Sequence, residues 1–150
     1  FTPLNESAAK PLTRLPTSIS ELDRVLGGGL VPGFAILIGG DPGIGKSTLL
    51  LQMAGALARS GESVAYISGE ESTAQIQLRA IRLHVEKTNI ALASATDVSD
   101  IIATIDSPNA PALVIIDSIQ TMYLNSLDSA PGTVAQVRAS SHALITAAKK

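Results

Sequence analysis

The stretch "GGDPGIGKSTLLLQMAGALA" constrains the fold most, because it gathers glycines into one turn between two apolar segments. The run before the turn, "FAILIGG", is continuously apolar, which is typical of a strand buried on both faces. The run after it begins at Lys46 and has the pattern of a helix that Gly61 ends. The turn is therefore predicted to join a buried strand to a helix.

Within this turn, the sequence matches the phosphate-binding pattern G-x-x-x-x-G-K-[ST]. Glycines let the backbone fold so tightly that successive N–H groups point at phosphate oxygens, and the following helix adds its positive end. Lys46 is expected to reach the β- and γ-phosphates, and the Ser47 hydroxyl to bind Mg²⁺. A glycine-rich turn without a ligand is the alternative. We predict a site for ATP and Mg²⁺ made by Gly40, Asp41, Pro42, Gly43, Ile44, Gly45, Lys46, Ser47 and Thr48.

Strand and helix patterns alternate along the rest of the chain. Strands are predicted in "SVAYISG", "NIALAS" and "PALVIID", and helices in "STAQIQLRAIRL", "DVSDIIATI" and "TVAQVRASSHALITAAKK". Ser72 or Thr73 is the expected N-cap of the first of these helices, and Ser18 or Ser20 that of a short helix in "SISELDRVLGG". This alternation implies parallel strands joined by right-handed crossovers, in a layered α/β domain.

Composition limits the class of protein. The 150 residues are enough for one domain, with 1–17 predicted as a proline-containing lead-in linker and 18–150 as the core. Eleven basic and 13 acidic residues without a basic run give no nucleic-acid footprint. The absence of cysteine excludes disulfides and cysteine zinc sites, and no signal peptide or membrane span is written here, so we expect a cytoplasmic protein without membrane contact. The chain opens without Met and closes within a predicted helix, so we expect a piece of something longer.

Three acidic residues stand at predicted strand ends. Asp117 closes "LVIID", the form of a Walker B strand whose carboxylate holds Mg²⁺ through water. Glu70 and Glu71 follow "YISG", at the rim where open α/β sheets bind ligands, and one of them could orient or activate the attacking water. The alternative for Glu70 and Glu71 is that they are acidic residues at a helix N-terminus, where the helix dipole favours negative charge. Spacing alone favours neither interpretation.

Other charged residues are interpreted as structural. Arg79 and Arg82 lie three apart on one predicted helix face, where a solvated face is favoured over contact with a nucleotide or a neighbouring subunit. His84 and His142 have no second ligand at metal-binding spacing.

Four segments together resemble the ATPase core of the RadA (Sms) family, bacterial DNA-repair proteins of the RecA superfamily. They are "TSISELDRVLGGGLVPGFAILIGGDPGIGKSTLLLQMA", "YISGEES", "LVIIDSIQTMY" and "APGTVAQVRASSHAL". The resemblance runs from about Pro16 to Lys150, and the combination of "SGEES" with "PGTVAQVR" is its most specific part. It implies a RecA-like P-loop NTPase fold.

The resemblance also implies residue roles. Glu70, rather than Glu71, would position the attacking water, Thr48 would contact the α-phosphate, and Asp117 with Ser118 would serve Mg²⁺ and γ-phosphate sensing. Residues 122–132 would correspond to a DNA-facing loop, although they contain no Lys or Arg. The nearest cation, Arg138, fits a solvated helix face at least as well.

At the level of the protein, the resemblance implies ATP hydrolysis that drives single-stranded or branched DNA binding and branch migration, beside a RecA-type recombinase and as a hexameric ring. The family's zinc finger, "KNRFG" motif and Lon-like domain are not in these residues. Its sheet takes the strand between the phosphate-loop strand and the Walker B strand from later sequence, so we expect these residues alone not to form a stable ATPase. A KaiC-like signalling or scaffold ATPase is the alternative, and a small-molecule kinase is disfavoured because no arginine-bearing lid is seen.

Overall fold

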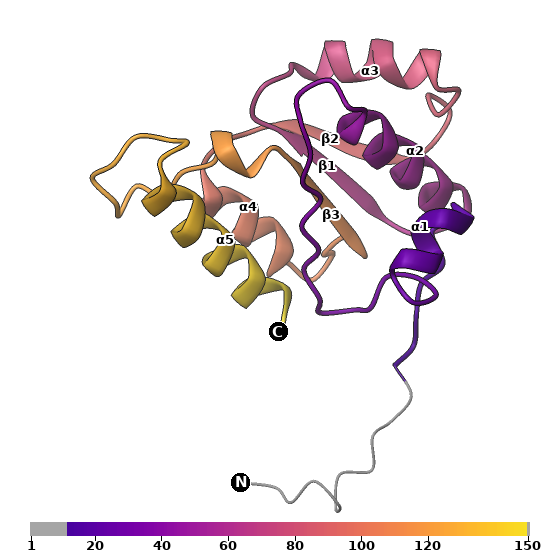
Figure 1. Cartoon of the computed structure of the whole chain (residues 1–150), viewed down its shortest axis with the longest axis horizontal. Coiled ribbons are helices and arrows are strands. Elements are labelled where there is room, and N and C mark those ends of the chain that lie inside the picture. Colours follow the sequence, from indigo (N-terminus) through magenta and orange to yellow (C-terminus); the bar gives the residue numbers. More distant parts are fainter. Residues whose placement is uncertain (1–11, 150) are drawn as a thin grey trace, which may run out of the picture.

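The computed structural model describes residues 12–149, which form a three-stranded parallel sheet with helices on both faces (Figure 1). The elements are α1 (Ser20–Val25), α2 (Lys46–Arg59), β1 (Val64–Ser68), α3 (Thr73–Arg82), β2 (Ile90–Ser94), α4 (Val98–Ile105), β3 (Leu113–Asp117), the 3₁₀ helix η2 (Ile119–Thr121) and α5 (Val134–Ala148). The three strands after the glycine-rich turn and the helices between them are those that the hydrophobic pattern predicted.

The sheet order is β2-β1-β3, so β1 lies in the centre. All five residues of β1 are buried, as expected for a parallel strand covered on both faces. In register, Ser68 at the end of β1 is opposite Ser94 on one side and Asp117 on the other. The carboxyl ends of all three strands therefore share one edge, where open α/β sheets bind ligands.

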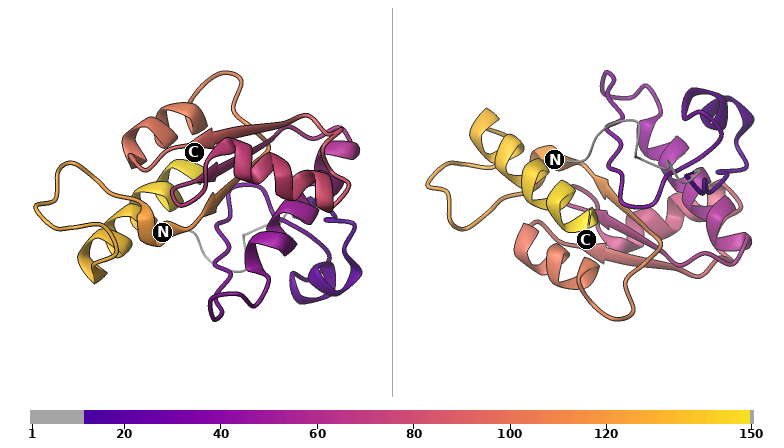
Figure 2. Two further views of the ribbon diagram at one scale, coloured as in Figure 1. Left: turned by 90° about the horizontal axis from the view of Figure 1, so that it is seen from above. Right: turned by 90° about the horizontal axis from the view of Figure 1, so that it is seen from below.

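Two apolar clusters cover the two faces of the sheet. One joins α2 and α3 to the sheet and has as its buried residues Leu51, Met53, Ala54, Leu57, Val64, Tyr66, Ile76, Ala80, Val85 and Ile115. The other joins α4 and α5 to the opposite face through Ile67, Val98, Ile101, Met122 and Leu144. Figure 2 shows α2 and α4 on opposite sides of the strands. Successive residues Tyr66 and Ile67 thus point into different clusters, which assigns Tyr66 to the α2 face.

Two predicted helix ends, at Ser72 and at Gly61, are confirmed, and the structure shows two further N-caps that the sequence analysis did not name. Ser72 caps α3 in a reciprocal capping box with Gln75, which decides between Ser72 and Thr73. Asp97 caps α4 and Thr133 caps α5 through their side chains. The chain leaves α2 through Gly61, whose φ of 97° lies in the left-handed region that glycine favours.

The predicted N-cap of α1 is wrong. Ile19 occupies the cap position and makes no side-chain cap bond. Instead, Asp23 within the helix accepts hydrogen bonds from the backbone N–H of Thr17 at 2.8 Å and its hydroxyl at 2.7 Å. Ser18, at a φ of 62°, lies one residue before the cap position, and Ser20 is already the first residue of the helix, so neither serine is the N-cap. Residues 1–11 of the predicted lead-in lie outside the described residues.

The predicted buried strand in "FAILIGG" is also wrong. Residues 34–40 pair with no strand of the described chain, and the side chains of Phe34 and Leu37 are 62% and 84% exposed. In the described sheet β3 pairs only with β1, so its other side is an edge. The faces of a parallel strand are covered by helices once the strand is part of a sheet, and residues 34–40 have joined no sheet among the described residues.

Candidate functional site

The phosphate loop wraps around the side chain of the lysine that ends it. Gly43 and Gly45 have φ values of 78° and 104°, which residues with a Cβ rarely adopt, and α2 begins at the next residue, Lys46. The Lys46 ammonium group donates hydrogen bonds to the backbone carbonyls of Gly40 and, at 2.8 Å, Asp41. The loop therefore curls around a positive charge at the start of a 14-residue helix.

The electrostatics of this helix start suit an anion. The first N–H groups of a helix have no intrahelical acceptor, and they carry the positive end of the helix dipole. The described first turn of α2 contains no acidic residue, and Gly45 provides no side-chain cap. The positive end is thus not neutralised from within the helix, as phosphate binding requires. The loop from Asp41 to Gly45 and Thr48 are exposed, so a ligand could approach.

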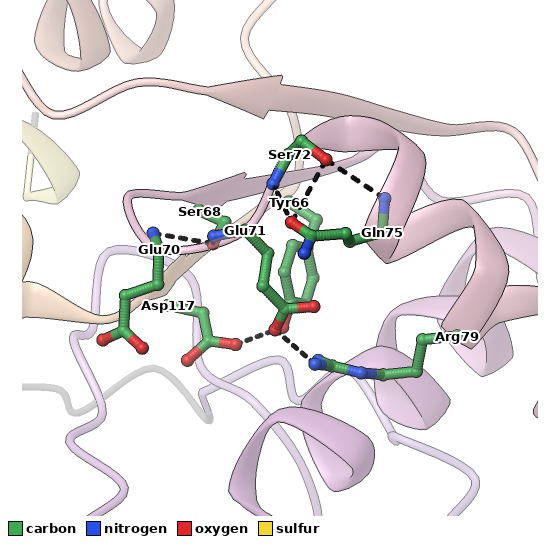
Figure 3. Close-up of polar contacts among 8 residues, drawn as sticks. All are labelled: Tyr66, Ser68, Glu70, Glu71, Ser72, Gln75, Arg79 and Asp117. Atoms are coloured by element: carbon green, nitrogen blue, oxygen red, sulfur yellow. Dashed lines mark hydrogen bonds and ion pairs between the residues drawn. The ribbon is translucent and has the colours of Figure 1, made fainter.

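Asp117 lies at the end of β3 and is bound by a residue that the sequence analysis missed. The hydroxyl of Tyr66, from the middle of β1, donates a hydrogen bond of 2.6 Å to Asp117 Oδ2 (Figure 3). Tyr66 is fully buried, and burial together with this hydrogen bond raises its pKa well above the ordinary range for tyrosine. The hydroxyl therefore remains a neutral donor. A signal was available: a tyrosine in a buried strand usually needs a partner for its hydroxyl.

Glu70 and Glu71 begin from one turn and diverge. The hydroxyl of Ser68 accepts hydrogen bonds from the backbone N–H groups of both, at 3.2 and 3.0 Å. The Glu70 carboxylate accepts a hydrogen bond of 2.8 Å from the hydroxyl of Ser118. Ser118 directly follows Asp117, to which it is joined by a cis peptide bond. The structure thus brings Glu70, from the end of β1, beside the end of β3.

Glu71 is bound to α3 instead. Its carboxylate forms an ion pair with the guanidinium group of Arg79, and the two side chains are 26% and 20% exposed (Figure 3). The interpretation of Arg79 as part of a solvated face is therefore wrong, since the pair removes both groups from most of the solvent. Arg82 and Arg138 are exposed, as are His84 and His142. Within residues 12–149, no group of three or more His, Cys, Asp or Glu side chains could hold a metal ion by itself.

The turn after β1 is in direct contact with the turn after β3. A Cβ on Gly69 would lie 2.0 Å from Thr121 Oγ1 and 2.6 Å from Thr121 Cβ, so only glycine fits there. The Thr121 hydroxyl donates to the Ser118 carbonyl at 2.8 Å, which fixes η2 behind the site. The position of Glu70 is therefore set by close packing as well as by hydrogen bonds.

Residues 122–132, expected as a DNA-facing loop, are held by a buried glutamine of α5. The Gln136 side chain, 1% exposed, accepts from the backbone N–H of Leu124 at 3.0 Å and donates to the carbonyls of Leu124, Leu127 and Ser129. Tyr123 at the start of the segment pairs with the backbone beside Asp97, and the Gln136 side chain satisfies further backbone groups of the loop beyond it. The pattern of the loop gave no indication of this anchor.

A parallel α/β sheet with a phosphate loop before a helix and carboxylates at adjacent strand ends defines the class of P-loop NTPase domains. Residues 3–148 match the family described as "AAA domain", and the chain belongs to that family. No helix among residues 12–149 is both long and apolar enough to span a membrane.

The chain is similar to curated proteins named DNA repair protein RadA. It is 60% identical to that of Brucella abortus (strain 2308) over 91% of the chain, 53% to that of Rickettsia typhi over 100%, and 49% to that of Bacillus subtilis (strain 168) over 96%. These matches cover 30%, 34% and 31% of the relatives. The chain thus spans about a third of their length, and the resemblance seen in the sequence is confirmed.

Two solved structures share the fold. A DnaB-like replicative helicase matches with a TM-score of 0.73 at 19% identity, over 96% of this chain and 42% of that chain. The flagellar accessory protein FlaH of Methanocaldococcus jannaschii matches with a TM-score of 0.64 at 23% identity, over 93% and 67%. At these identities the likeness shows the fold alone, and it confirms the predicted RecA-like α/β class.

Proposed function

We propose that this chain is the ATP-hydrolysing core of a DNA-repair motor of the RadA type. The observation that carries the proposal is the meeting of Glu70, Ser118 and Asp117 at the ends of adjacent parallel strands, on the edge where such sheets bind ligands. The phosphate loop precedes them in the chain, and the similar curated proteins are named for DNA repair.

The residues fit Mg²⁺–ATP. Carboxylate and hydroxyl oxygens are the ligands that Mg²⁺ prefers, and the site offers both at Asp117 and Ser47. When bound, Mg²⁺ neutralises charge on the phosphate oxygens. Lys46 and the backbone N–H groups at the start of α2 bind the β- and γ-phosphates, and the exposed Thr48 contacts the α-phosphate.

Glu70 is the residue that orients and activates the attacking water. A general base must be within hydrogen-bonding reach of the proton that it removes, and its carboxylate must have an acceptor position available. Among residues 12–149, the Glu70 carboxylate bonds one neutral side chain, the Ser118 hydroxyl, whereas the Glu71 carboxylate is paired with the cation of Arg79. Glu70 therefore orients and activates the water, and Glu71 holds the turn to α3.

The work on DNA and the assembly are further parts of the proposal. Single-stranded or branched DNA would bind at residues 122–132, and hydrolysis would drive branch migration in a hexameric ring beside a RecA-type recombinase in the cytoplasm. The support is the name of the similar curated proteins and the anchored conformation of the loop. Since the loop contains no Lys or Arg, DNA contact there depends on backbone N–H groups and polar side chains.

The test is ATP hydrolysis by the intact protein, with and without single-stranded DNA, over a salt series and beside Lys46→Ala. Stimulation by DNA that decreases with salt, and disappears in Lys46→Ala, is the expected result because phosphate contacts release counterions. Turnover that ignores DNA while nucleotide changes the oligomeric state would instead favour a signalling or scaffold ATPase.

A further inference from the structure

A buried phenol hydroxyl contacts the carboxylate that the proposed function assigns to Mg²⁺. Tyr66 is 0% exposed and belongs to the apolar cluster under α2 and α3. The ring lies within that cluster, and the hydroxyl at its end donates a hydrogen bond of 2.6 Å to Asp117 Oδ2. Among residues 12–149, no other hydrogen bond to the Asp117 carboxylate is found.

The register explains why a tyrosine is used. Tyr66 lies opposite Ile115, and Asp117 lies opposite Ser68, two residues further along the pair. The hydroxyl must therefore cross from β1 to β3 and also advance two residues, about 6.6 Å along and about 4.8 Å across. A serine or threonine at position 66 is too short for this diagonal. A phenylalanine fills the same volume but has no donor.

The bond restricts the carboxylate. An aspartate at a strand end can rotate about both side-chain torsions, and the terminal one is broad. With Oδ2 bound by a hydroxyl that packing holds in place, Asp117 is limited to orientations that keep this bond. Its half-buried position leaves the carboxylate partly open to the site edge. A group that orients a metal-binding side chain in this way affects metal binding through that side chain, without contacting the metal itself.

We propose that Tyr66 is a positioning residue that holds the Asp117 carboxylate in the orientation that serves Mg²⁺–nucleotide. This inference rests on the proposed function, because it takes Asp117 as the Mg²⁺ carboxylate. The role belongs to the hydroxyl, whereas the ring belongs to the apolar core.

The test is Tyr66→Phe in the intact protein, read by equilibrium binding of a fluorescent ATP analogue during a Mg²⁺ titration. The Mg²⁺ concentration for half-maximal binding is expected to rise about tenfold, the lower range for loss of a ligand-orienting group. Nucleotide affinity without Mg²⁺ is expected to stay unchanged, since the phosphate loop is not altered.

Ile67→Val is the matched control. Ile67 is the next residue of β1, is 4% exposed and faces the α4–α5 side, so the variant loosens the same strand without touching Asp117. It is expected to leave the Mg²⁺ midpoint unchanged. A second control is the double variant with Asp117→Asn: Tyr66→Phe should cause no further shift there, because the two residues act as a unit.

The outcomes separate the two proposals. If the unaltered protein shows no Mg²⁺-dependent nucleotide binding, the proposed function fails. If it shows such binding but Tyr66→Phe keeps the same Mg²⁺ midpoint, only the positioning role is overturned. Equal shifts in Tyr66→Phe and Ile67→Val, or a full further shift in the Asp117→Asn background, would also overturn it.

Discussion

The Glu70 carboxylate accepts a hydrogen bond of 2.8 Å from the hydroxyl of Ser118, a residue 48 positions later in the chain. This bond joins the turn after β1 to the turn after β3. Glu71, the residue after Glu70, points to α3 and forms an ion pair with Arg79. Two adjacent glutamates that look equivalent in the sequence are therefore held in different environments, and their substitution should have different effects.

Glu70→Gln is expected to lower the rate of ATP hydrolysis by about 100-fold or more while nucleotide binding is retained. The amide keeps the size of the side chain but cannot accept a proton. Single-turnover hydrolysis and equilibrium binding are the measurements. Glu71→Gln is the matched control and should lose far less activity, and equal losses in the two variants would contradict the assignment.

Arg79→Gln and Glu71→Gln are each expected to lower the free energy of unfolding by about 1–3 kcal/mol. Each leaves the opposite charge largely buried without its partner, since the side chains are only 20% and 26% exposed. Chemical denaturation measures the loss. The double variant should lose less than the sum of the single ones, and strict additivity would show that the pair contributes nothing as a pair.

Gly69→Ala is expected to destabilise the protein by about 1–3 kcal/mol, because a new Cβ would overlap the side chain of Thr121. Gly39→Ala provides the control, since a Cβ at Gly39 would meet nothing within 4 Å in the described structure. The melting temperatures of the two variants, compared with that of the unaltered protein, measure the difference in stability. A Gly69→Ala protein as stable as the control would mean that the two turns are not in close contact.

Lys46→Ala is expected to weaken ATP binding by about 10- to 100-fold, the value of one or two hydrogen bonds to a charged group. Among the described residues, the Lys46 ammonium group bonds the loop carbonyls of Gly40 and Asp41 in an exposed region, so the melting temperature should change little. Calorimetric titration and a melting curve on the same sample test both statements. An unchanged ATP affinity would show that Lys46 does not bind the nucleotide and would contradict the proposed role of the phosphate loop.

Gln136→Leu is expected to speed amide hydrogen exchange at Leu124, whose N–H bonds the glutamine side chain. The carbonyls of Leu127 and Ser129 lose their donor as well, so the loop should open more often. Exchange at Ile67 in the central strand should not change. Equal protection of Leu124 in both proteins would show that the glutamine does not anchor the loop.

Local patterns in the sequence predicted much of the fold. The helices α2 to α5 and the three strands follow from periodicity, capping residues and glycine, and the phosphate loop from its motif. The predicted strand over residues 34–40 failed because pairing depends on neighbours, which apolar character cannot show. The cap of α1 failed because the left-handed conformation of Ser18 turns the chain before the helix.

The side-chain contacts of the site were beyond the sequence for a related reason. Tyr66 and Asp117 are 51 residues apart, and their contact depends on the register of two parallel strands. The choice of Arg79 as the partner of Glu71 likewise depends on where α3 begins after the turn. Such contacts follow from the assembled sheet, whereas a motif reports only what is adjacent along the chain.

The contact between Gly69 and Thr121 has a mechanical consequence. Because not even a methyl group fits between them, Gly69 cannot move toward η2 unless Thr121 also moves. Thr121 directly precedes the loop that Gln136 holds. A displacement of the turn after β1 is therefore expected to reach the start of the Gln136-anchored loop through Thr121.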